Sequence, residues 1–478
     1  MKGTPHMSLT ELVRDPVTRC AKASELIYAG RYEEAREVLG ELWRGVGIRP
    51  NVDGYPPEIA AEALLQCGSL SGFLGHAQVK DVQERAKDLL TEALHIFQTL
   101  NLKAKVSEAQ YELGVCYWRV GAYEEARIVL NEALNEATPE QHGKIVVVRA
   151  LVEIFSGRYE EAQSILIEFR PAFESASHAL KGRWHGHMGL ALRRMAGGRI
   201  EILDKAIIEF TAAIYHYEQA GHERYCGSNL NNLAMLLYKL GRYQEAHEHL
   251  NKASYIFKRL KDPGTAAQVE ETRVRVLLAE ERYEEARRVI IEVVDTFEKS
   301  GEQGLLADAL RLKATIEARM FDYDNSLQTF RHAINTAENA GALSIAGCAA
   351  LSLIEEHGER LSERKLYHIY RRADRLLANT QDADDMERLR ACARLVMRKL
   401  YGPDLDENFT LPETVLKYEA RFIEQALKEE KCSVSRAARR LGLSHQTLGA
   451  ILKTRHQSLR TKKPQTRRKS IIPKDKRS

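Results

Sequence analysis

The sequence predicts an all-α protein: a solenoid of helical hairpins followed by a small three-helix domain. Three observations lead to this fold class. Proline accounts for only 12 of 478 residues, about half of its usual share, so long helices are favoured. A six-residue motif recurs through the first 330 residues, and the last 48 residues become strongly basic. The chain is also too long for a single compact core.

The recurring motif has the form GRYEEA. Its clear copies lie at residues 30–35, 121–126, 157–162, 241–246 and 281–286, and weaker copies end at Ala86, Ala206 and Ser326. An amphipathic helix precedes each copy, and glycine permits a tight turn after it. We expect the tyrosine to wedge between two helices and the alanine to let them lie close together. Neither helix can bury its apolar face alone, so at least eight such hairpins should stack.

These positions resemble the tetratricopeptide repeat, which has a small residue at its eighth position, Gly at its fifteenth, Tyr at its seventeenth and Ala at its twentieth. The last four copies are 40 residues apart, a spacing that resembles the longer-helix form of bacterial signalling regulators. The resemblance implies about eight to nine units over residues 20–376. It also implies a closing helix at 385–400 and a poorly matching segment at 44–57.

In a solenoid of this repeat, the first helices of successive units line a concave groove. The register of the repeat places these side chains in it: Tyr111, Trp118, Arg119, Asn231, Asn232, Tyr238, Lys239, Glu271 and Arg275. Asparagine can bond to the backbone of an extended peptide as donor and acceptor, while the aromatic and arginine side chains would form pockets. The resemblance therefore implies a protein or peptide ligand. The alternative is that these residues pack between repeats or are merely solvated.

The charge is distributed unequally along the chain. Residues 431–478 contain fifteen Lys or Arg and one acid, a net charge of +14; because the whole chain carries +4, the first 430 residues carry −10. Such asymmetry indicates a polyanionic partner for the C-terminal end. The tail at 456–478 has almost no aromatic residues, so we expect it to be disordered alone and to contact nucleic-acid phosphates.

The segment after residue 400 predicts a linker and then a helix. Gly402 and Pro403 mark a linker at 401–409. Thr410 and Glu413 predict a capping box at the start of a helix over 413–430. The apolar stripe of this helix comprises Val415, Tyr418, Phe422, Ile423, Ala426 and Leu427.

Two shorter helices follow, at 434–441 and from Ser444 to Lys453, with Gly442 at the turn between them. Ala438 is small enough for a close crossing, and glycine can adopt the positive φ that a tight turn requires. Leu448 faces inward. This spacing predicts a helix-turn-helix at 410–455.

Residues 422–448 resemble the DNA-binding end of the Fis family, most closely in the SRAARRLG stretch. The resemblance implies a homodimer formed through helix 413–430 and a recognition helix in the major groove of double-stranded DNA. By position, His445 and Gln446 would meet base edges. The predicted DNA-binding set also includes Ser444, Thr447 and Lys453 at phosphates, together with Arg436, Arg440 and Arg455.

The recognition helix departs from the family, which usually has Arg, Lys or an aromatic residue where this chain has His445, Gln446, Gly449 and Ala450. Glycine within a short helix costs about 1 kcal/mol relative to alanine. The alternative is therefore a degenerate module that binds DNA weakly or serves only as a helical dimer element.

The sequence contains no P-loop, GxGxxG, HExxH or GxSxG motif, so we expect no catalytic site, cofactor or ATPase. The nearest approaches to a metal-ligand cluster are Trp184 with His185 and His187, and His222 with Cys226, which we interpret as packing rather than ligands. Seven scattered cysteines without a CxxC pair favour a reducing cytoplasm. The absence of an 18-residue apolar run argues against a membrane span.

Two classes of function remain. The first is a cytoplasmic, nucleoid-associated transcriptional regulator in which the solenoid binds a protein, peptide or signal and controls the dimeric helix-turn-helix. The second is an interaction scaffold whose basic C-terminus docks on RNA or an acidic partner. The complete helix-turn-helix favours the regulator, because a scaffold would not need one.

Overall fold

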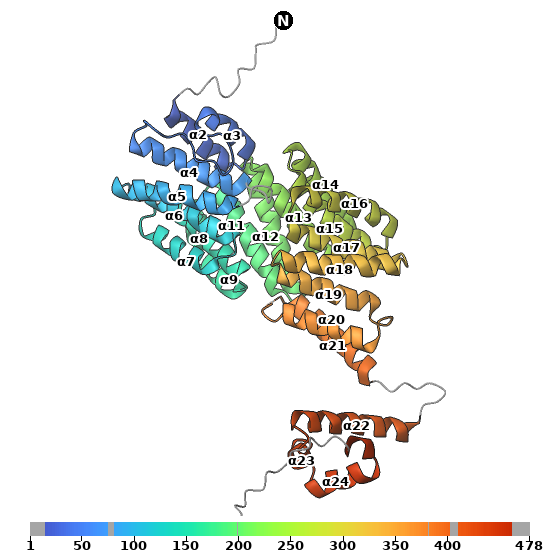
Figure 1. Ribbon diagram of the computed structural model, residues 1–478. Helices are drawn as coiled ribbons and strands as arrows, with labels where there is room; N and C mark the ends of the chain where they lie inside the picture. The colour runs from blue at the N-terminus through green and yellow to red at the C-terminus, as the bar shows by residue number, and fades with distance from the viewer. Residues whose placement is uncertain (1–14, 75–80, 198, 381, 402–409, 461–478) are drawn as a thin grey trace, which may run out of the picture. The chain divides into compact units, whose positions relative to one another are not determined.

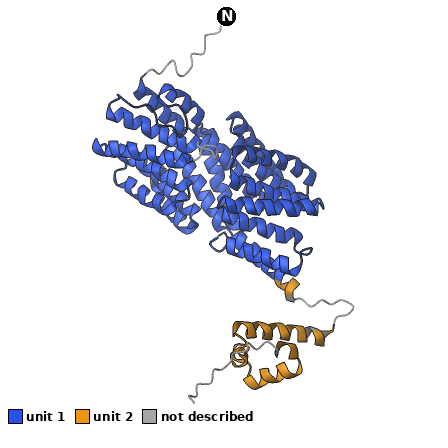
Figure 2. Ribbon diagram, in the orientation of Figure 1, with its two compact units in different colours: residues 1–396 blue, residues 397–478 orange. Residues whose placement is uncertain are grey.

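The computed structural model describes residues 15–74, 81–197, 199–380, 382–401 and 410–460. Within these ranges the regular structure consists of helices, with no strand, which confirms the predicted fold class. The chain divides into two compact units, residues 1–396 and 397–478 (Figures 1 and 2). The predicted tail lies outside the described residues beyond 460.

Consecutive helices of the first unit pair into nine hairpins within the described ranges. They are α2 (Pro16–Tyr28) with α3 (Tyr32–Leu39), α4 (Pro57–Leu74) with α5 (Val82–Thr99), α6 (Lys103–Arg119) with α7 (Tyr123–Asn135), α8 (Pro139–Phe155) with α9 (Tyr159–Glu168), α11 (His178–Met195) with α12 (Ile200–Gln219), α13 (Glu223–Lys239) with α14 (Tyr243–Arg259), α15 (Pro263–Ala279) with α16 (Tyr283–Ser300), α17 (Gln303–Arg319) with α18 (Tyr323–Asn339), and α19 (Leu343–His357) with α20 (Glu363–Leu376).

Three further elements complete this series. The short helices η1 (Gly40–Leu42) and α10 (Arg170–Phe173) follow α3 and α9. The closing helix is α21 (Ala383–Tyr401), slightly longer than the predicted span of 385–400. The poorly matching segment at 44–57 contains turns and bends up to the start of α4.

The recurring motif lies at or within the second helix of eight of the nine hairpins, and α20 has no copy. The tyrosine is the first residue of α3, α7, α9, α14, α16 and α18. Every motif alanine, and the serine in the last copy, has an exposed fraction of 0%: Ala35, Ala86, Ala126, Ala162, Ala206, Ala246, Ala286 and Ser326. The two helices of a hairpin therefore approach where no larger side chain would fit.

In most hairpins the turn has a left-handed backbone whether or not glycine is present; the turn between α19 and α20 is an exception, with φ of −56° at Gly358. Gly121 and Gly241 have φ of 78° and 72°, whereas Glu281 and Phe321 adopt 58° and 65° at the same place in their own repeats. The hairpin geometry dictates this conformation, and glycine reduces its cost.

The second unit contains α22 (Leu411–Glu429), α23 (Val434–Arg440), α24 (His445–Thr454) and η2 (Gln457–Arg460). The three α-helices agree with the predicted helix-turn-helix. Thr410 is the N-cap residue of α22 as predicted, but the predicted capping box is wrong, because Thr410 makes no side-chain capping hydrogen bond. The short helix η2 was not predicted.

The first unit folds back on itself at two places far apart in the sequence. Arg224, in α13, donates from Nε to the carbonyl oxygen of Gly30 at 3.3 Å, although 194 residues separate them. Arg194, in α11, lies 2.6 Å from the carboxylate of Asp382, just before α21. The first contact joins two hairpins that are not neighbours along the solenoid, and the second joins a hairpin to the segment before the closing helix.

The first of these closures can be tested with two glycines in equivalent turns. Gly30 and Gly121 have φ of 72° and 78°, so replacement by alanine should cost each about 1–2 kcal/mol of backbone strain. Only at Gly30 would the new Cβ meet another hairpin, 2.6 Å from Cε1 of His222; at Gly121 nothing lies within 4 Å. We expect Gly30→Ala to lower the free energy of unfolding by roughly 1–3 kcal/mol more than Gly121→Ala, measured by urea denaturation. Equal losses would contradict the closure.

Candidate nucleic-acid interface and repeat groove

The helix-turn-helix has a hydrophobic core of its own. Its buried side chains come from all three helices: Ile423, Ala426 and Leu427 of α22, Ala437 and Ala438 of α23, and Leu448 and Leu452 of α24. Ala438 is 1% exposed, as expected at a close helix crossing. The turn between α23 and α24 is closed by the Leu443 N–H, which donates to the carbonyl of Ala438 at 2.8 Å.

The first turn of α24 presents a polar surface. His445, Gln446 and Thr447 are all exposed. Ser444 is the N-cap, and its Oγ accepts a hydrogen bond from the Thr447 N–H at 3.0 Å. The Ser444 hydroxyl thus holds the start of the helix that positions the two predicted base-reading side chains.

Three of the predicted DNA-binding arginines already face carboxylates of α22 or of the residue that follows it. Arg436 lies 3.5 Å from Glu430, Arg440 lies 2.6 Å from Glu429, and Arg455 donates to Glu419 at 3.3 Å. These arginines are more than half exposed, and exposed ion pairs contribute little to stability. They can therefore exchange a carboxylate for a phosphate at small cost.

The structure adds residues that the sequence did not indicate. Arg439, which was not in the predicted DNA-binding set, is exposed and makes no ion pair among the described residues. The predicted Lys453 is likewise exposed and makes no ion pair within these ranges. His456 is 7% exposed and bonds through Nε2 to Glu419 at 2.9 Å, which ties the end of α24 to α22. A histidine after a basic stretch gave no sequence signal of this role, because its partner lies 37 residues away.

The predicted apolar stripe of α22 divides into two faces. Ile423, Ala426 and Leu427 belong to the domain core. By contrast, Val415 and Phe422 are 54% and 56% exposed. Only this second face is free to pack against another molecule.

In the N-terminal half of the solenoid, Tyr111 lines a cavity of about 420 Å³ together with Arg183 and Lys144. The Tyr111 hydroxyl accepts a hydrogen bond from Arg183 Nη1 at 3.0 Å. The Arg183 guanidinium lies over the rings of Tyr28 and Tyr225, 5.6 and 5.4 Å from their centres. Among the described residues, this arginine is held by aromatic and hydroxyl groups rather than by a carboxylate.

In the C-terminal half, Tyr238 and Arg275 line a second cavity of about 460 Å³. Arg275 lies 2.7 Å from both Glu271 and Asp308. Burial raises the pKa of Glu271 to about 8. Although burial opposes it, Arg311 and Arg275 lower the pKa of Asp308. The carboxylate of Asp308 therefore neutralises part of the positive charge on this wall.

The predicted groove residues are not gathered at one site. Lys239 pairs with Asp384, whereas Trp118, Asn231 and Asn232 line neither cavity. Trp118 packs edge-on against Phe155 with ring centres 5.3 Å apart. The indole N–H of Trp118 and the side-chain oxygen of Asn231 are buried without a hydrogen-bond partner among the described residues.

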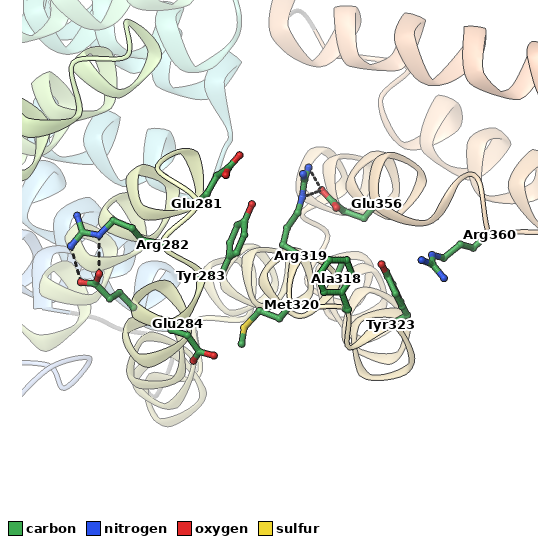
Figure 3. A pocket seen from close by; sticks show the side chains of 12 residues that line it. Glu281, Arg282, Tyr283, Glu284, Ala318, Arg319, Met320, Tyr323, Glu356 and Arg360 are labelled. Carbon is green, nitrogen blue, oxygen red and sulfur yellow. Dashed lines mark hydrogen bonds and ion pairs between the residues drawn. The ribbon is translucent and has the colours of Figure 1, made fainter.

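A larger cavity of the first unit, about 790 Å³, lies at the hairpin turns and contains none of the predicted groove residues (Figure 3). Tyr283 and Tyr323, the first residues of α16 and α18, line it. The Arg360 guanidinium lies 3.6 Å from the ring centre of Tyr323, and Arg319 pairs with Glu356 at 2.8 Å. Its arginines are thus already paired with carboxylates or an aromatic ring of the same wall.

The histidines nearest to a metal-ligand pattern have structural contacts instead, as does the tryptophan beside them. Trp184 donates to the carbonyl of Leu166, and His187 bonds to the carbonyl of Val147, each at 2.8 Å. The described residues contain no group of three or more His, Cys, Asp or Glu arranged to hold a metal ion. Within the same ranges, no helix is both long and apolar enough to cross a membrane.

Family models match both parts of the chain. Tetratricopeptide-repeat models match residues 84–142 and 228–259, and a model described as "Bacterial regulatory protein, Fis family" matches residues 416–453. The chain contains tetratricopeptide repeats and a Fis-type helix-turn-helix. Both resemblances seen in the sequence are thereby confirmed, and the Fis match covers most of α22, all of α23 and most of α24. A comparison with curated proteins gave no match.

Solved structures with similar folds are helical-repeat proteins. A Rap protein complexed with competence and sporulation factor is 14% identical, covers 80% of this chain and 99% of its own, and superposes with a TM-score of 0.51. Aspartyl phosphate phosphatase F from Bacillus subtilis is 13% identical over 79% of this chain and 96% of its own, with a TM-score of 0.48. A signal transduction ATPase with a tetratricopeptide-repeat sensor from Pyrococcus horikoshii is 12% identical over 76% and 55%, with a TM-score of 0.48.

The two glycines of the Fis-type helix-turn-helix should respond oppositely to substitution. Gly442 has φ of 68°, so Gly442→Val forces a β-branched residue into the left-handed region and should destabilise the domain by about 1–3 kcal/mol. Gly449 lies within α24, with nothing within 4 Å of an added Cβ. Gly449→Ala should therefore stabilise the domain by about 1 kcal/mol. Thermal unfolding of the full chain measures both; destabilisation by Gly449→Ala would contradict the described helix.

Proposed function

We propose that this protein is a non-catalytic, DNA-binding transcriptional regulator whose solenoid binds a protein or peptide and controls a dimeric helix-turn-helix module. The observation that carries the proposal is the exposed polar first turn of α24, held on a complete helix-turn-helix core. Such a helix can enter the major groove, where the edges of all four base pairs are distinguishable. We place the protein in the cytoplasm, associated with the nucleoid.

The electrostatics of the second unit support DNA as its partner. Lys428 and Lys453 flank the groove between α22 and α24 that His445 and Gln446 also line. Arg439 adds an exposed cation on α23. Positive side chains around a polar recognition surface favour phosphate contacts beside base contacts.

The exposed face of α22 supports self-association. Val415, Leu416 and Phe422 are 54%, 38% and 56% exposed and contribute nothing to the domain core. They are spaced so that Val415 and Phe422, seven residues apart, lie on one side of the helix. We infer that a second copy of α22 packs there, which would present two recognition helices to two half-sites.

The base-reading role is tested by separating sequence preference from salt dependence. Replacing His445 and Gln446 with alanine should lower discrimination between sequences by roughly 1–3 kcal/mol per lost base contact, while leaving the salt dependence of affinity nearly unchanged. Deleting residues 460–478 removes nine basic residues and one acid. It should make the slope of log affinity against log salt shallower by about 0.9 per lost phosphate contact. Fluorescence anisotropy with duplex DNA measures both.

The scaffold interpretation predicts a different pattern of DNA binding. If deletion of 460–478 abolished all binding while the His445 and Gln446 substitutions changed nothing, the helix-turn-helix would not read DNA. Tighter binding of RNA than of duplex DNA by the intact chain would point the same way.

The dimer is tested on the exposed face of α22. Val415→Asn with Phe422→Gln should weaken dimerisation at least tenfold, because burying one phenylalanine contributes roughly 2 kcal/mol. Sedimentation of the full chain measures this change. Glu424→Gln, at another exposed position of α22, is the matched control. Ile423, which the sequence also suggested as a dimer contact, is unsuitable because it is 2% exposed in the domain core. A monomer that still bound DNA at full strength would contradict the arrangement.

A further inference from the structure

A strongly charged cavity of about 460 Å³ lies among α11, α13, α15, α17, α19 and the start of α21. Six basic and four acidic side chains line it. Three of the four acids, Asp382, Asp384 and Asp385, come from one short segment at the start of α21. Without that segment, Asp308 would be the one carboxylate left among the six basic side chains of the lining.

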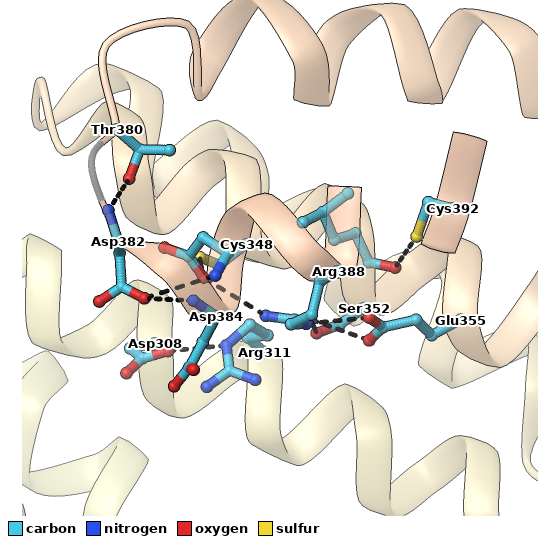
Figure 4. A network of polar contacts seen from close by, with 12 residues as sticks. Asp308, Arg311, Cys348, Ser352, Glu355, Thr380, Asp382, Asp384, Arg388 and Cys392 are labelled. Atoms are coloured by element: carbon cyan, nitrogen blue, oxygen red, sulfur yellow. Dashed lines mark hydrogen bonds and ion pairs between the residues drawn. The ribbon is translucent and has the colours of Figure 1, made fainter. Parts of the chain in front are cut away.

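The acidic segment contacts the cavity wall through its carboxylates. Asp382 Oδ2 lies 2.6 Å from Arg194 Nη1, and Asp384 pairs with Lys239. The Cys348 thiol donates to Asp385 Oδ1 at 3.1 Å, and Figure 4 shows Cys348 beside the segment. The carboxylates of one short peptide stretch therefore reach three different helices: α11, α13 and α19.

The two ion pairs between the acidic segment and the cavity wall are partly exposed to solvent. The side chains of Arg194 and Asp382 are 40% and 24% exposed, and those of Lys239 and Asp384 are 35% and 48% exposed. Ion pairs that solvent reaches are weak. Another set of carboxylates could therefore replace the internal ones.

One cation of the cavity lacks a direct ion pair. The side chain of Arg193 is half-buried and, among the described residues, makes no hydrogen bond or ion pair, although the charges of Asp382 and Asp384 act on it. Burial and the adjacent Arg194 lower its pKa to about 10, and the charges of Asp382 and Asp384 oppose this shift. Because the segment makes no direct ion pair with this half-buried cation, the wall can accept a further carboxylate at Arg193.

We propose that this cavity binds an acidic peptide segment, and that residues 382–385 of the chain are its internal occupant. The occupant already present is itself a peptide with carboxylates at alternate and adjacent positions. An external segment of similar charge would take over Arg194 and Lys239 and add a contact to Arg193. Displacement would release the start of α21, which ends at Tyr401, directly before the segment that precedes α22. Only this last step, the transmission to DNA binding, rests on the proposed function.

The test uses a fluorescent synthetic peptide of residues 379–388 and the full-length chain, with binding followed by anisotropy. The variant Asp382→Asn/Asp384→Asn should bind the peptide about threefold to tenfold more tightly than the natural chain, because it removes two weak competing ion pairs. Asparagine at 382 can still accept the N–H of Asp384, which lies 3.0 Å from the Asp382 carboxylate, so the start of α21 is preserved. A peptide with Asn at all three Asp positions should not bind.

The matched control breaks the same two ion pairs from the other side. Arg194→Gln/Lys239→Gln also frees the acidic segment but removes the site, so peptide affinity should fall instead of rising. Arg193→Gln should weaken peptide binding to the Asp382→Asn/Asp384→Asn variant without changing its melting temperature. Equal effects of the two double variants, or equal binding of the Asn peptide, would overturn the proposal and leave only a structural closure.

Parallel DNA-binding measurements keep the two proposals distinguishable. Peptide binding that follows the expected pattern supports the acidic-peptide site even if DNA affinity does not respond, in which case the control of the helix-turn-helix by the solenoid is wrong. DNA binding without any peptide binding would overturn the acidic-peptide site and leave the proposed function standing.

Discussion

The architecture depends on the close approach of two helices at one small residue in eight of the nine hairpins. Seven motif alanines and Ser326 are 0% exposed, so a larger side chain at these places would separate the helices. Ser326 keeps its hydroxyl satisfied there by donating to the carbonyl of Ala314 at 2.8 Å. Because a single hairpin cannot bury its apolar face, this local contact obliges the hairpins to stack. Stacking in turn brings charged side chains of successive first helices onto common walls.

The first unit has several separate cavities, and two long-range closures lie beside two of them. The turn at Gly30 contacts α13 through Arg224, and Asp382 contacts α11 through Arg194. Both cavities receive an arginine of α11 that makes no direct ion pair with a carboxylate among the described residues: Arg183 in one and Arg193 in the other. The charged sites of the solenoid are therefore separate from one another, and the order of the repeats alone gives no signal for them.

Much of the fold could be predicted from the sequence because its signals are local. The GRYEEA motif located the hairpin turns, and Gly442 with Ala438 located the helix crossing of the second unit. Partners far apart in the sequence could not be predicted: Lys239 pairs with Asp384 across 145 residues, and His456 pairs with Glu419 across 37. For the same reason the apolar stripe of α22 could not be divided, since Ile423 and Phe422 are adjacent in sequence but only Ile423 joins the core. The left-handed backbone at Lys431 and Cys432 could not be predicted from the sequence either, because neither residue type favours this conformation.

We propose that α24 reads DNA sequence as one of a symmetric pair of recognition helices. Selection of bound fragments from a pool of random duplexes by the full-length chain, at moderate salt, tests it most directly. We predict enrichment of a two-fold symmetric sequence whose half-sites are separated by about one helical turn or a multiple of it. Retention of DNA without any enriched sequence would contradict the claim, because it would show that the basic C-terminal end binds phosphates alone.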